Sequence, residues 1–245
     1  MISVAVGGAT GKLGRMVCDM INSSEDMTLT GAIVSPAGKN IGCELYNGVK
    51  AKGPDDLENV LENADVYVDL TSPDAASKII ARVPATGTNM IIGTTSIPDD
   101  IIKKMSSEVS VNGTSALISS NFAIGVNVFW DMCGKLASLL KGYDTEIIET
   151  HHIQKKDSPS GTSREIVKRI MKASGDTRKD ICVHSVRAGD VVGDHTVIFA
   201  GNKEVIELKH KAVSREAFAM GCLRSIRWIH GKRDGTVHEM SEVLL

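Results

Sequence analysis

The chain has 245 residues, of which 42% are hydrophobic and 24% charged, and its formal net charge at pH 7 is −2. A chain of this length and apolar content can bury a full core as one large domain or two smaller ones, which excludes global disorder. Because acidic and basic residues are well mixed, no basic face predicts nucleic-acid binding and no polybasic run predicts a membrane surface. The expected partner is therefore a small molecule.

Two further features bear on localisation and metal binding. Met1 leads directly into a strand-like run, without the cationic start and apolar stretch of a signal peptide, so we expect a cytoplasmic protein. The cysteines are widely spaced and form no C-x-x-C pair; they are Cys18, Cys43, Cys133, Cys182 and Cys222. We interpret them as reduced thiols and expect no metal site.

The first predicted element is a strand over residues 2–6, and a glycine-rich turn and a helix follow it. Glycines at 8, 11 and 14 give the spacing G-x-x-G-x-x-G. Strand, glycine turn and helix are the context of a dinucleotide-binding loop, where glycines let the backbone approach a pyrophosphate at the helix start. The alternative is an ordinary tight turn. The candidate cofactor contacts are Gly8, Ala9, Thr10, Gly11, Lys12, Leu13, Gly14 and Arg15.

The second predicted strand, residues 29–34, ends without the acid that NAD enzymes usually place on the ribose 2′-hydroxyl. Ser35 and Lys39 follow it instead and, with Arg15, could contact a 2′-phosphate. We therefore expect NADPH as the preferred cofactor, with NADH as the other candidate. The alternative is a simple turn in which Lys39 is a solvated surface charge.

Strands and helices alternate through the rest of the first half. Strands are predicted at 66–70, 89–92 and 116–119, and helices at about 53–56 onwards, 71–82 and 125–140. This alternation predicts a Rossmann-type parallel sheet in a dinucleotide-binding domain over residues 1–122, with its binding crevice at the carboxyl ends of the strands. Polar residues at those ends are Thr71, Ser72, Gly93, Thr94 and Thr95. For Thr71 and Ser72 we favour a helix-capping role.

The second half predicts a smaller α+β domain with a mixed sheet, over residues 123–212. Strands are expected at 145–152, 182–186, 196–200 and 205–211, with a hairpin turn at 200–203. A helix from Ser214 to His230 and a tail over 236–245 follow. We expect residues 213–245 to rejoin the first domain.

The stretch E-T-H-H-I-Q-K-K-D-S-P-S-G-T, residues 149–162, concentrates the chemistry of the second half. It combines His151, His152 and Lys155 with a Gly161-Thr162 turn at a helix start. Backbone N–H groups at a helix start can grip a carboxylate, and a histidine is the proton donor suited to neutral pH. The stretch therefore predicts a site for an anionic substrate beside an acid–base group.

Five runs of sequence together resemble one enzyme family. They are G-x-x-G-x-x-G-R-M near the start, G-T-T (93–95), N-F-A-I-G-V-N-V (121–128), H-H-I-Q-K-K-D-S-P-S-G-T (151–162) and R-A-G-D-V-V-G-D-H-T (187–196). In this order they resemble the dihydrodipicolinate reductase family, also called 4-hydroxy-tetrahydrodipicolinate reductase, of diaminopimelate and lysine biosynthesis. The resemblance implies reduction of a cyclic dicarboxylate by NADPH or NADH, with loss of water, in a homotetramer assembled through the second domain.

The resemblance also implies roles for individual residues. His151 matches the family's general acid/base, and His152 and Lys155 match positions linked to substrate binding and proton donation. Ser160, Gly161 and Thr162 match the turn that holds a substrate carboxylate. Further cofactor positions are Gly93, Thr94, Thr95, Ser119, Ser120, Asn121 and Phe122. Ser35 departs from the family, because some members carry a glutamate there for the adenosine ribose.

Other interpretations remain open from the sequence. One is a different NAD(P)-dependent oxidoreductase of two-domain build, such as an aspartate or diaminopimelate dehydrogenase. Another is a non-catalytic dinucleotide-sensing module, which would have no need for His151, Lys155 and the Gly161-Thr162 turn in one run. Arg187 and His195 are interpreted as residues of a subunit interface or a domain seam, with no catalytic role.

Overall fold

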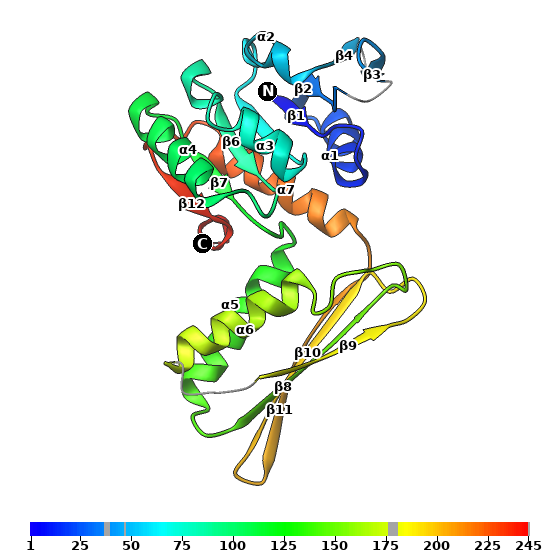
Figure 1. The fold of residues 1–245 in the computed structure, drawn as a ribbon, viewed down its shortest axis with the longest axis vertical. Coiled ribbons are helices and arrows are strands. Elements are labelled where there is room, and N and C mark those ends of the chain that lie inside the picture. Colours follow the sequence, from blue (N-terminus) through cyan, green and yellow to red (C-terminus); the bar gives the residue numbers. More distant parts are fainter. Residues whose placement is uncertain (37–39, 47, 176–180, 245) are drawn as a thin grey trace. The chain divides into compact units, whose positions relative to one another are not determined.

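The computed structural model describes residues 1–36, 40–46, 48–175 and 181–244. Contacts divide the chain into two compact units (Figure 1). Unit 1 comprises Met1–Phe122 with Phe218–Leu245, and unit 2 comprises Ala123–Ala217. Within the described residues, no helix is both long enough and apolar enough to cross a bilayer.

Unit 1 is built on a sheet whose described strands run in the order β12-β7-β6-β5-β1-β2-β4-β3. All neighbouring pairs are parallel except β3 with β4. The strands are β1 (Ile2–Gly7), β2 (Met27–Ile33), β3 (Glu44–Tyr46), β4 (Val49–Lys52), β5 (Val66–Asp69), β6 (Asn89–Ile92), β7 (Ala116–Ile118) and β12 (Val237–Glu239). The predicted Rossmann-type parallel sheet is confirmed.

Helices cover both faces of this sheet. They are α1 (Lys12–Asn22), α2 (Leu57–Leu61), α3 (Pro73–Ile79), α4 (Asp99–Asn112), α7 (Glu216–Ile229) and α8 (Met240–Val243), with short 3-10 turns at Pro54–Asp56 and Pro84–Thr86. Figure 1 shows α3 and α4 on one face of the sheet and α1 and α7 on the other. Every residue of β5 and β6 is buried, as expected for central parallel strands covered on both sides.

The strand order reverses between β1 and β5. In parallel α/β sheets this is the point where loops at the carboxyl ends of the strands diverge and leave a binding crevice. The loops that follow β1, β5 and β6 therefore meet at one edge of the sheet. They carry the glycine-rich turn, Thr71 and the Gly93-Thr94-Thr95 run.

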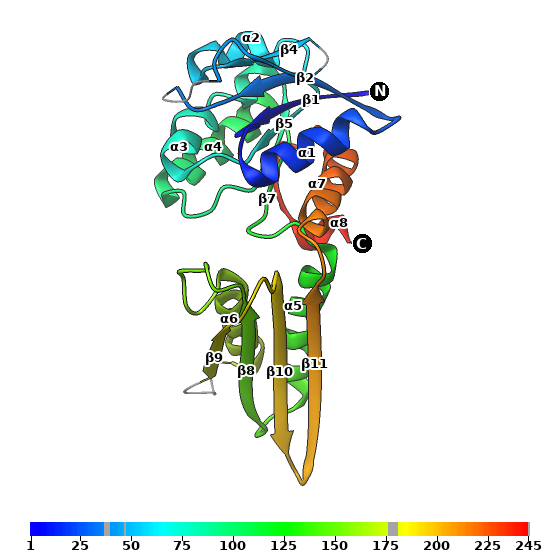
Figure 2. The same ribbon diagram turned by 90° about the vertical axis from the view of Figure 1, so that its right-hand side faces the viewer.

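Unit 2 is a mixed sheet with two helices on one face (Figure 2). Its strands are β8 (Asp144–His151), β9 (Cys182–Arg187), β10 (Gly193–Gly201) and β11 (Glu204–Ala212), in the order β11-β10-β8-β9. Strands β8 and β9 are parallel, and the other pairs are antiparallel. Helices α5 (Ile124–Leu139) and α6 (Gly161–Ser174) cover the sheet. The expected mixed sheet is confirmed.

Alternation along β8 decides which side chains face the helices. Thr145, Ile147, Glu149 and His151 are buried, whereas Asp144 and Ile148 are exposed. Successive side chains of a strand point to opposite faces, so Glu149 and His151 share the face that α5 and α6 cover. The sheet thus turns a carboxylate and an imidazole inward.

The predicted hairpin between β10 and β11 is present, with Asn202 and Lys203 at φ 48° and 68°. The helix predicted over 71–82 is shorter in the structure, where α3 spans Pro73–Ile79. A turn follows it, in which the N–H of Arg82 donates to the carbonyl of Ile79. The edge strand β3 and its neighbour β4 were not predicted, since three or four residues give too little alternation to detect.

Candidate active site

The residues of the His-His stretch surround the junction of β8 and α6. Strand β8 ends at His151, a loop follows, and Ser160 caps α6 by accepting the N–H of Ser163 on its side-chain oxygen. The site is thus a strand end joined by a short loop to a helix start. Each part was expected from the sequence.

Glu149 lies at the centre of this junction and is fully buried. Four groups donate to its carboxylate: the backbone N–H of Ser160 at 3.1 Å, the hydroxyls of Ser163 and Ser185 at 2.7 Å each, and the Arg187 guanidinium at 3.1 Å. Burial alone would raise the pKa of Glu149, but these hydrogen bonds outweigh it and lower the pKa to about 2. Glu149 is therefore an ionised carboxylate inside the protein.

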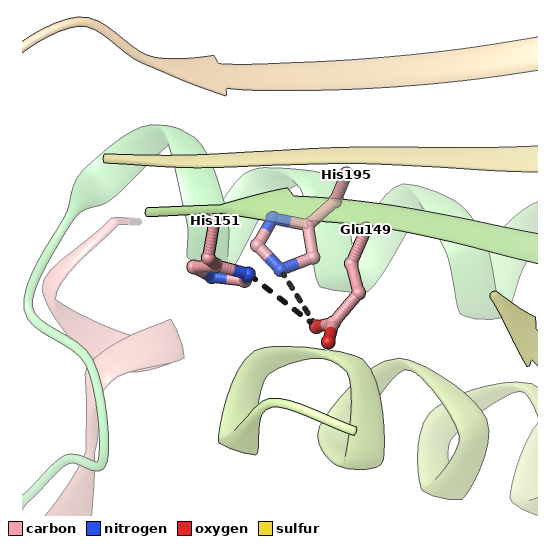
Figure 3. Close-up of side chains that lie close together, drawn as sticks. All are labelled: Glu149, His151 and His195. Atoms are coloured by element: carbon pink, nitrogen blue, oxygen red, sulfur yellow. Dashed lines mark ion pairs between the residues drawn. The ribbon is translucent and has the colours of Figure 1, made fainter. Parts of the chain in front are cut away.

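Two histidines point toward the same oxygen of Glu149 (Figure 3). His151 Nδ1 lies 3.7 Å from Oε2, and His195 Nε2, on the neighbouring strand β10, lies 3.9 Å from it. The two rings meet edge to face with centroids 5.1 Å apart. His195 is directly opposite Glu149 in the register of β8 with β10. The carboxylate can thus accept a hydrogen bond from either ring after a shift of under an ångström.

Both imidazoles are neutral at pH 7. Burial lowers the pKa of His151, the negative charge of Glu149 opposes this, and the positive charges of Lys155 and Arg187 add to it. Burial lowers the pKa of His195 to about 3, and repulsion from His151, once that ring is protonated, adds to the effect. A neutral His151 needs a proton before it can act as an acid, and an anionic ligand close by would favour that proton.

Gly193, the first residue of β10, leaves room for the His151 ring. A Cβ at Gly193 would lie 3.2 Å from His151 Nε2 and 3.7 Å from the His195 ring. A separation of 3.2 Å is tighter than a relaxed contact, so glycine at this position lets both rings fit under β10.

The remaining predicted substrate residues take different positions. Lys155 is largely buried and pairs through Nζ with Asp157 at 2.8 Å. His152 is half-buried, and its carbonyl accepts the N–H of Lys155. Ser160 is 1% exposed and committed to Glu149 and Ser163. The backbone groups that the first turn of α6 presents to a ligand are therefore those of Gly161 and Thr162.

Glu149, His151 and His195 also have the donor types of a transition-metal site, with ligand atoms within 4.8 Å of one another. The carboxylate, however, already accepts four donors, one of them the Arg187 cation. A metal ion would have to displace these donors and lie beside a guanidinium. The arrangement favours an acid–base role over a metal centre.

The glycine-rich loop of unit 1 is shaped by close backbone contacts. Gly8 has φ +76°, and a Cβ there would lie 2.2 Å from the Leu70 carbonyl oxygen. A Cβ at Gly14 would lie 2.1 Å from the Gly8 carbonyl oxygen. Gly11 precedes α1 with extended backbone and no side-chain cap. The first amides of α1 therefore follow a loop in which glycine backbone lies close together, which fits an approaching pyrophosphate.

A second buried carboxylate, Asp69, holds the neighbouring loops of unit 1 together. The hydroxyls of Tyr67, Thr71 and Thr94 donate to it at 2.9, 2.8 and 2.5 Å. The Thr94 of the predicted cofactor run is thus fixed by the end of β5. Ser72, as favoured from the sequence, accepts the N–H of Ala75 and caps α3.

The other predicted cofactor residues lie at strand ends of unit 1. Ser35 is exposed two residues beyond β2, and Lys39 lies outside the described residues. Gly93 packs closely, since a Cβ there would lie 2.6 Å from the Phe122 ring. The Ser119 hydroxyl donates to the Asn121 carbonyl, and Ser120 is exposed. Thr10, Lys12, Leu13 and Arg15 lie in or just before the first turn of α1, Ala9 is buried behind it, and Thr95 is exposed after β6.

From the sequence we assigned no role to Glu149 or Asp69. Arg187 and His195 were assigned to an interface or a domain seam and not to the site. For Glu149 a signal existed, because it lies two residues before His151 and must share its face of the strand. For Asp69 the signal was its position at the end of an otherwise apolar strand. The partners of Arg187 are Glu149 in β8 and the carbonyls of Lys155 and Asp157 in the loop after it, at least 30 residues away in the chain, and no local pattern could reveal them.

Comparison with known proteins identifies the family. A model described as "Dihydrodipicolinate reductase, N-terminus" matches residues 2–122, and one described as "Dihydrodipicolinate reductase, C-terminus" matches residues 125–244. The chain belongs to the dihydrodipicolinate reductase family.

Individual relatives agree with this membership. The 4-hydroxy-tetrahydrodipicolinate reductase of Methanobrevibacter smithii is 38% identical, covering 100% of this chain and 99% of the relative. The enzyme of that name from Methanoregula boonei is also 38% identical, covering 100% and 98%. The resemblance to dihydrodipicolinate reductases inferred from the sequence is thereby confirmed.

Solved structures show the same fold. The dipicolinate-bound dihydrodipicolinate reductase of Paenisporosarcina sp. TG-14 has a TM-score of 0.85 at 24% identity, with full coverage of both chains. A C. glutamicum DAP dehydrogenase in complex with DAP has a TM-score of 0.62 at 14% identity, covering 100% of this chain and 95% of that one. The dihydrodipicolinate reductase fold thus shares its two-unit plan with dehydrogenases. Membership of this family supports a nicotinamide dinucleotide as the cofactor.

Proposed function

We propose that this chain reduces 4-hydroxy-tetrahydrodipicolinate to tetrahydrodipicolinate with loss of water, in diaminopimelate and lysine biosynthesis. One observation carries the proposal: within unit 2, the strand end at His151 and the loop that carries Lys155 lead into a helix start whose cap residue, Ser160, donates its N–H to buried Glu149. Membership of the dihydrodipicolinate reductase family supports the same reaction.

The substrate is a small dicarboxylate, and unit 2 offers positive groups for it. The amides of Gly161 and Thr162 at the start of α6 can bind one carboxylate. The Lys155 ammonium is paired with Asp157 at 2.8 Å and can exchange that carboxylate for one of the substrate's. His152, beside Lys155, would contribute to the same subsite. Orientation by these contacts can supply roughly 7–11 kcal/mol of a barrier.

His151 is assigned the proton in this reaction. Its pKa is lowered by burial, so it is neutral in the unliganded protein at pH 7. A bound dianion would raise that pKa and let His151 take up and then donate a proton. The dinucleotide, when bound, supplies the hydride. Glu149, ionised and 3.7 Å from Nδ1, is placed to stabilise the imidazolium.

A coupled assay tests the reaction directly. Substrate is generated freshly from pyruvate and aspartate semialdehyde by a separate condensing enzyme, and oxidation of NADPH is followed by absorbance. We expect turnover that depends on both precursors. Cofactor binding without any turnover would contradict the proposal and favour a dinucleotide-sensing module, while ammonia release from an amino acid would favour an amino-acid dehydrogenase.

For the cofactor we propose a preference for NADPH over NADH. No carboxylate follows β2 at Ser35 to repel a 2′-phosphate, and Arg15 lies in the first turn of α1. The test compares kcat/KM for the two cofactors in wild type and in Ser35→Glu. The substitution should move preference toward NADH, and a wild-type preference for NADH would contradict the proposal.

We also propose a homotetramer assembled through the open face of the unit 2 sheet. On this face Ile148, Val186 and Val205 are 38%, 43% and 59% exposed. Exposed apolar side chains gathered on one sheet face are typical of a protein interface. Light scattering coupled to size exclusion should give a tetramer for wild type and smaller species for Ile148→Asp. A monomeric wild type would contradict this.

A further inference from the structure

The run R-A-G at residues 187–189, which begins with the last residue of β9, holds the loop that carries the predicted substrate residues. The N–H of Ala188 donates to the His151 carbonyl at 2.8 Å, and the Gly189 carbonyl accepts the N–H of Ile153 at 3.1 Å. These two bonds extend the pairing of β8 with β9 past the end of both strands. His152 is therefore fixed on both sides through its backbone neighbours.

The Arg187 side chain also binds the backbone in the middle of this loop. Its Nε donates to the carbonyl of Lys155 at 3.3 Å, and its Nη2 donates to the carbonyl of Asp157 at 2.6 Å. Hydrogen bonds to these two carbonyls fix the backbone on both sides of Lys156. The side chain is 20% exposed, so most of the guanidinium lies under the loop.

The same guanidinium is tied to the buried carboxylate. Nη2 of Arg187 lies 3.1 Å from Oε1 of Glu149, and Glu149 accepts the N–H of Ser160. Ser160 is the residue at which the loop enters α6. One planar fork thus joins the middle of the loop to the anchor that fixes its end. A lysine could not make these bonds at once, because its single ammonium lacks the spread of donors.

We propose that Arg187 is a positioning residue for substrate binding, which holds the loop of residues 152–160 so that Lys155 and the Gly161-Thr162 turn face one dicarboxylate. The inference rests on the proposed function, which assigns Lys155 and the turn to the substrate. Arg187 acts through the backbone of the loop and through Glu149. A displacement of about 1 Å at such a site can cost roughly 100-fold in rate.

The test measures binding without turnover. The probe is pyridine-2,6-dicarboxylate, a planar dicarboxylate, and its Kd is measured by calorimetry on the full-length protein with saturating NADPH. We expect Arg187→Ala to weaken the probe by about 10- to 100-fold, because ordering of the loop must then be supplied by binding itself. Arg187→Lys should bind almost as weakly. The Kd of NADPH should stay unchanged in both variants.

Two additions separate positioning from general stability. Arg82→Ala removes an arginine of unit 1 that pairs with Glu58 and contacts no residue of the loop. It should lower thermal stability and leave the probe Kd unchanged. Guanidinium at millimolar concentration should restore part of the probe affinity in Arg187→Ala, and urea at the same concentration should not.

The outcomes are distinct from those of the proposed reaction. Wild-type affinity for the probe in Arg187→Lys, or in a folded Arg187→Ala, would overturn the positioning role. Failure of the wild type to bind the probe would overturn it too. A third outcome is that wild type binds the probe, the Arg187 variants bind it more weakly, and wild type shows no NADPH oxidation in the coupled assay. That outcome would overturn the proposed reaction and leave the positioning role of Arg187 supported.

Discussion

The two units each bury a carboxylate at the centre of a loop cluster, but they surround it differently. Asp69 in unit 1 accepts from the hydroxyls of Tyr67, Thr71 and Thr94. Glu149 in unit 2 accepts from a guanidinium as well as hydroxyls, and two imidazoles lie within 4 Å. The buried carboxylate of unit 1 is thus met by neutral hydroxyls, whereas that of unit 2 is met by a cation and lies beside two titratable rings.

This difference predicts how each half responds to substitution. Near Glu149 the chemistry depends on protons and ion pairs, so changes of charge should matter most. Near the glycine loop there is little side-chain chemistry, so changes of volume should matter most. Variants that alter charge at constant size, or size at constant charge, can separate the two.

The largest effect is expected for His151→Gln, which removes the proton donor and keeps a side chain of similar polarity. If His151 is the acid, kcat should fall by about 10²–10⁴-fold, with the Kd of NADPH unchanged. Steady-state kinetics and cofactor titration check this. His184→Gln is the control, because His184 lies exposed on β9 beside Glu146. Near-normal kcat in His151→Gln would remove it from the reaction.

Lys155→Ala tests a charged group of unit 2, and we expect a smaller loss of activity than for His151→Gln. Losing a charged hydrogen bond of about 1.5–3 kcal/mol should raise KM for the substrate and lower kcat/KM by about 10- to 100-fold. The neighbouring, exposed Lys156→Ala is the matched control for net charge. Equal kinetics for the two lysine variants would show that general positive charge, and no particular contact, attracts the dicarboxylate.

In unit 1, Gly14→Ala changes volume and leaves charge untouched. The new methyl would lie 2.1 Å from the Gly8 carbonyl oxygen, so the loop must shift. We expect a loss of about 1–3 kcal/mol in stability or in NADPH binding, measured by denaturation and titration. Gly53→Ala is the control, since its methyl would meet only Ile41 at 3.7 Å. An unaltered NADPH Kd and stability in Gly14→Ala would mean that the loop is not held by close packing.

The sequence predicted most of unit 1, because repeated strand, turn and helix signals follow one another along the chain. For the site it predicted His151, Lys155 and the Gly161-Thr162 turn, which are neighbours in the sequence. The hydrogen-bond network around Glu149 was not predicted from the sequence. Arg187 and His195 lie 38 and 46 residues away from Glu149 and meet it only through the register of β8 with β9 and β10.

The short strands show the same limit for the fold. Strand β12 pairs with β7 across more than 100 residues of chain, and β3 and β4 have only three and four residues. Such segments owe their structure to the sheet edge they join, so their own pattern carries little information. Local signals therefore gave the framework, and long-range pairing gave the site its buried charges.

The smallest expected effect is on the pH dependence of the free energy of unfolding, to which His195 of unit 2 contributes. The pKa of His195 is lowered by burial to about 3, whereas an unfolded histidine titrates near 6.5. Between those values the unfolded state binds the extra proton, so stability is full above pH 6.5 and falls as the pH is lowered. Removing this group should flatten the decline by at most about 1.4 kcal/mol per pH unit.

His195→Gln tests this, with the free energy of unfolding measured between pH 6.5 and 5. The slope that Glu149 adds lies mainly below about pH 4.5, because its pKa is lowered from 4.5 to about 2, and this slope is common to wild type and variant. Burial also lowers the pKa of His151 and of His210, so some slope should remain in the variant. His230→Gln, at an exposed histidine of unit 1, should leave the wild-type slope unchanged. Parallel curves for wild type and His195→Gln would show that His195 is not held neutral, and that the charge around Glu149 is less buried than its geometry indicates.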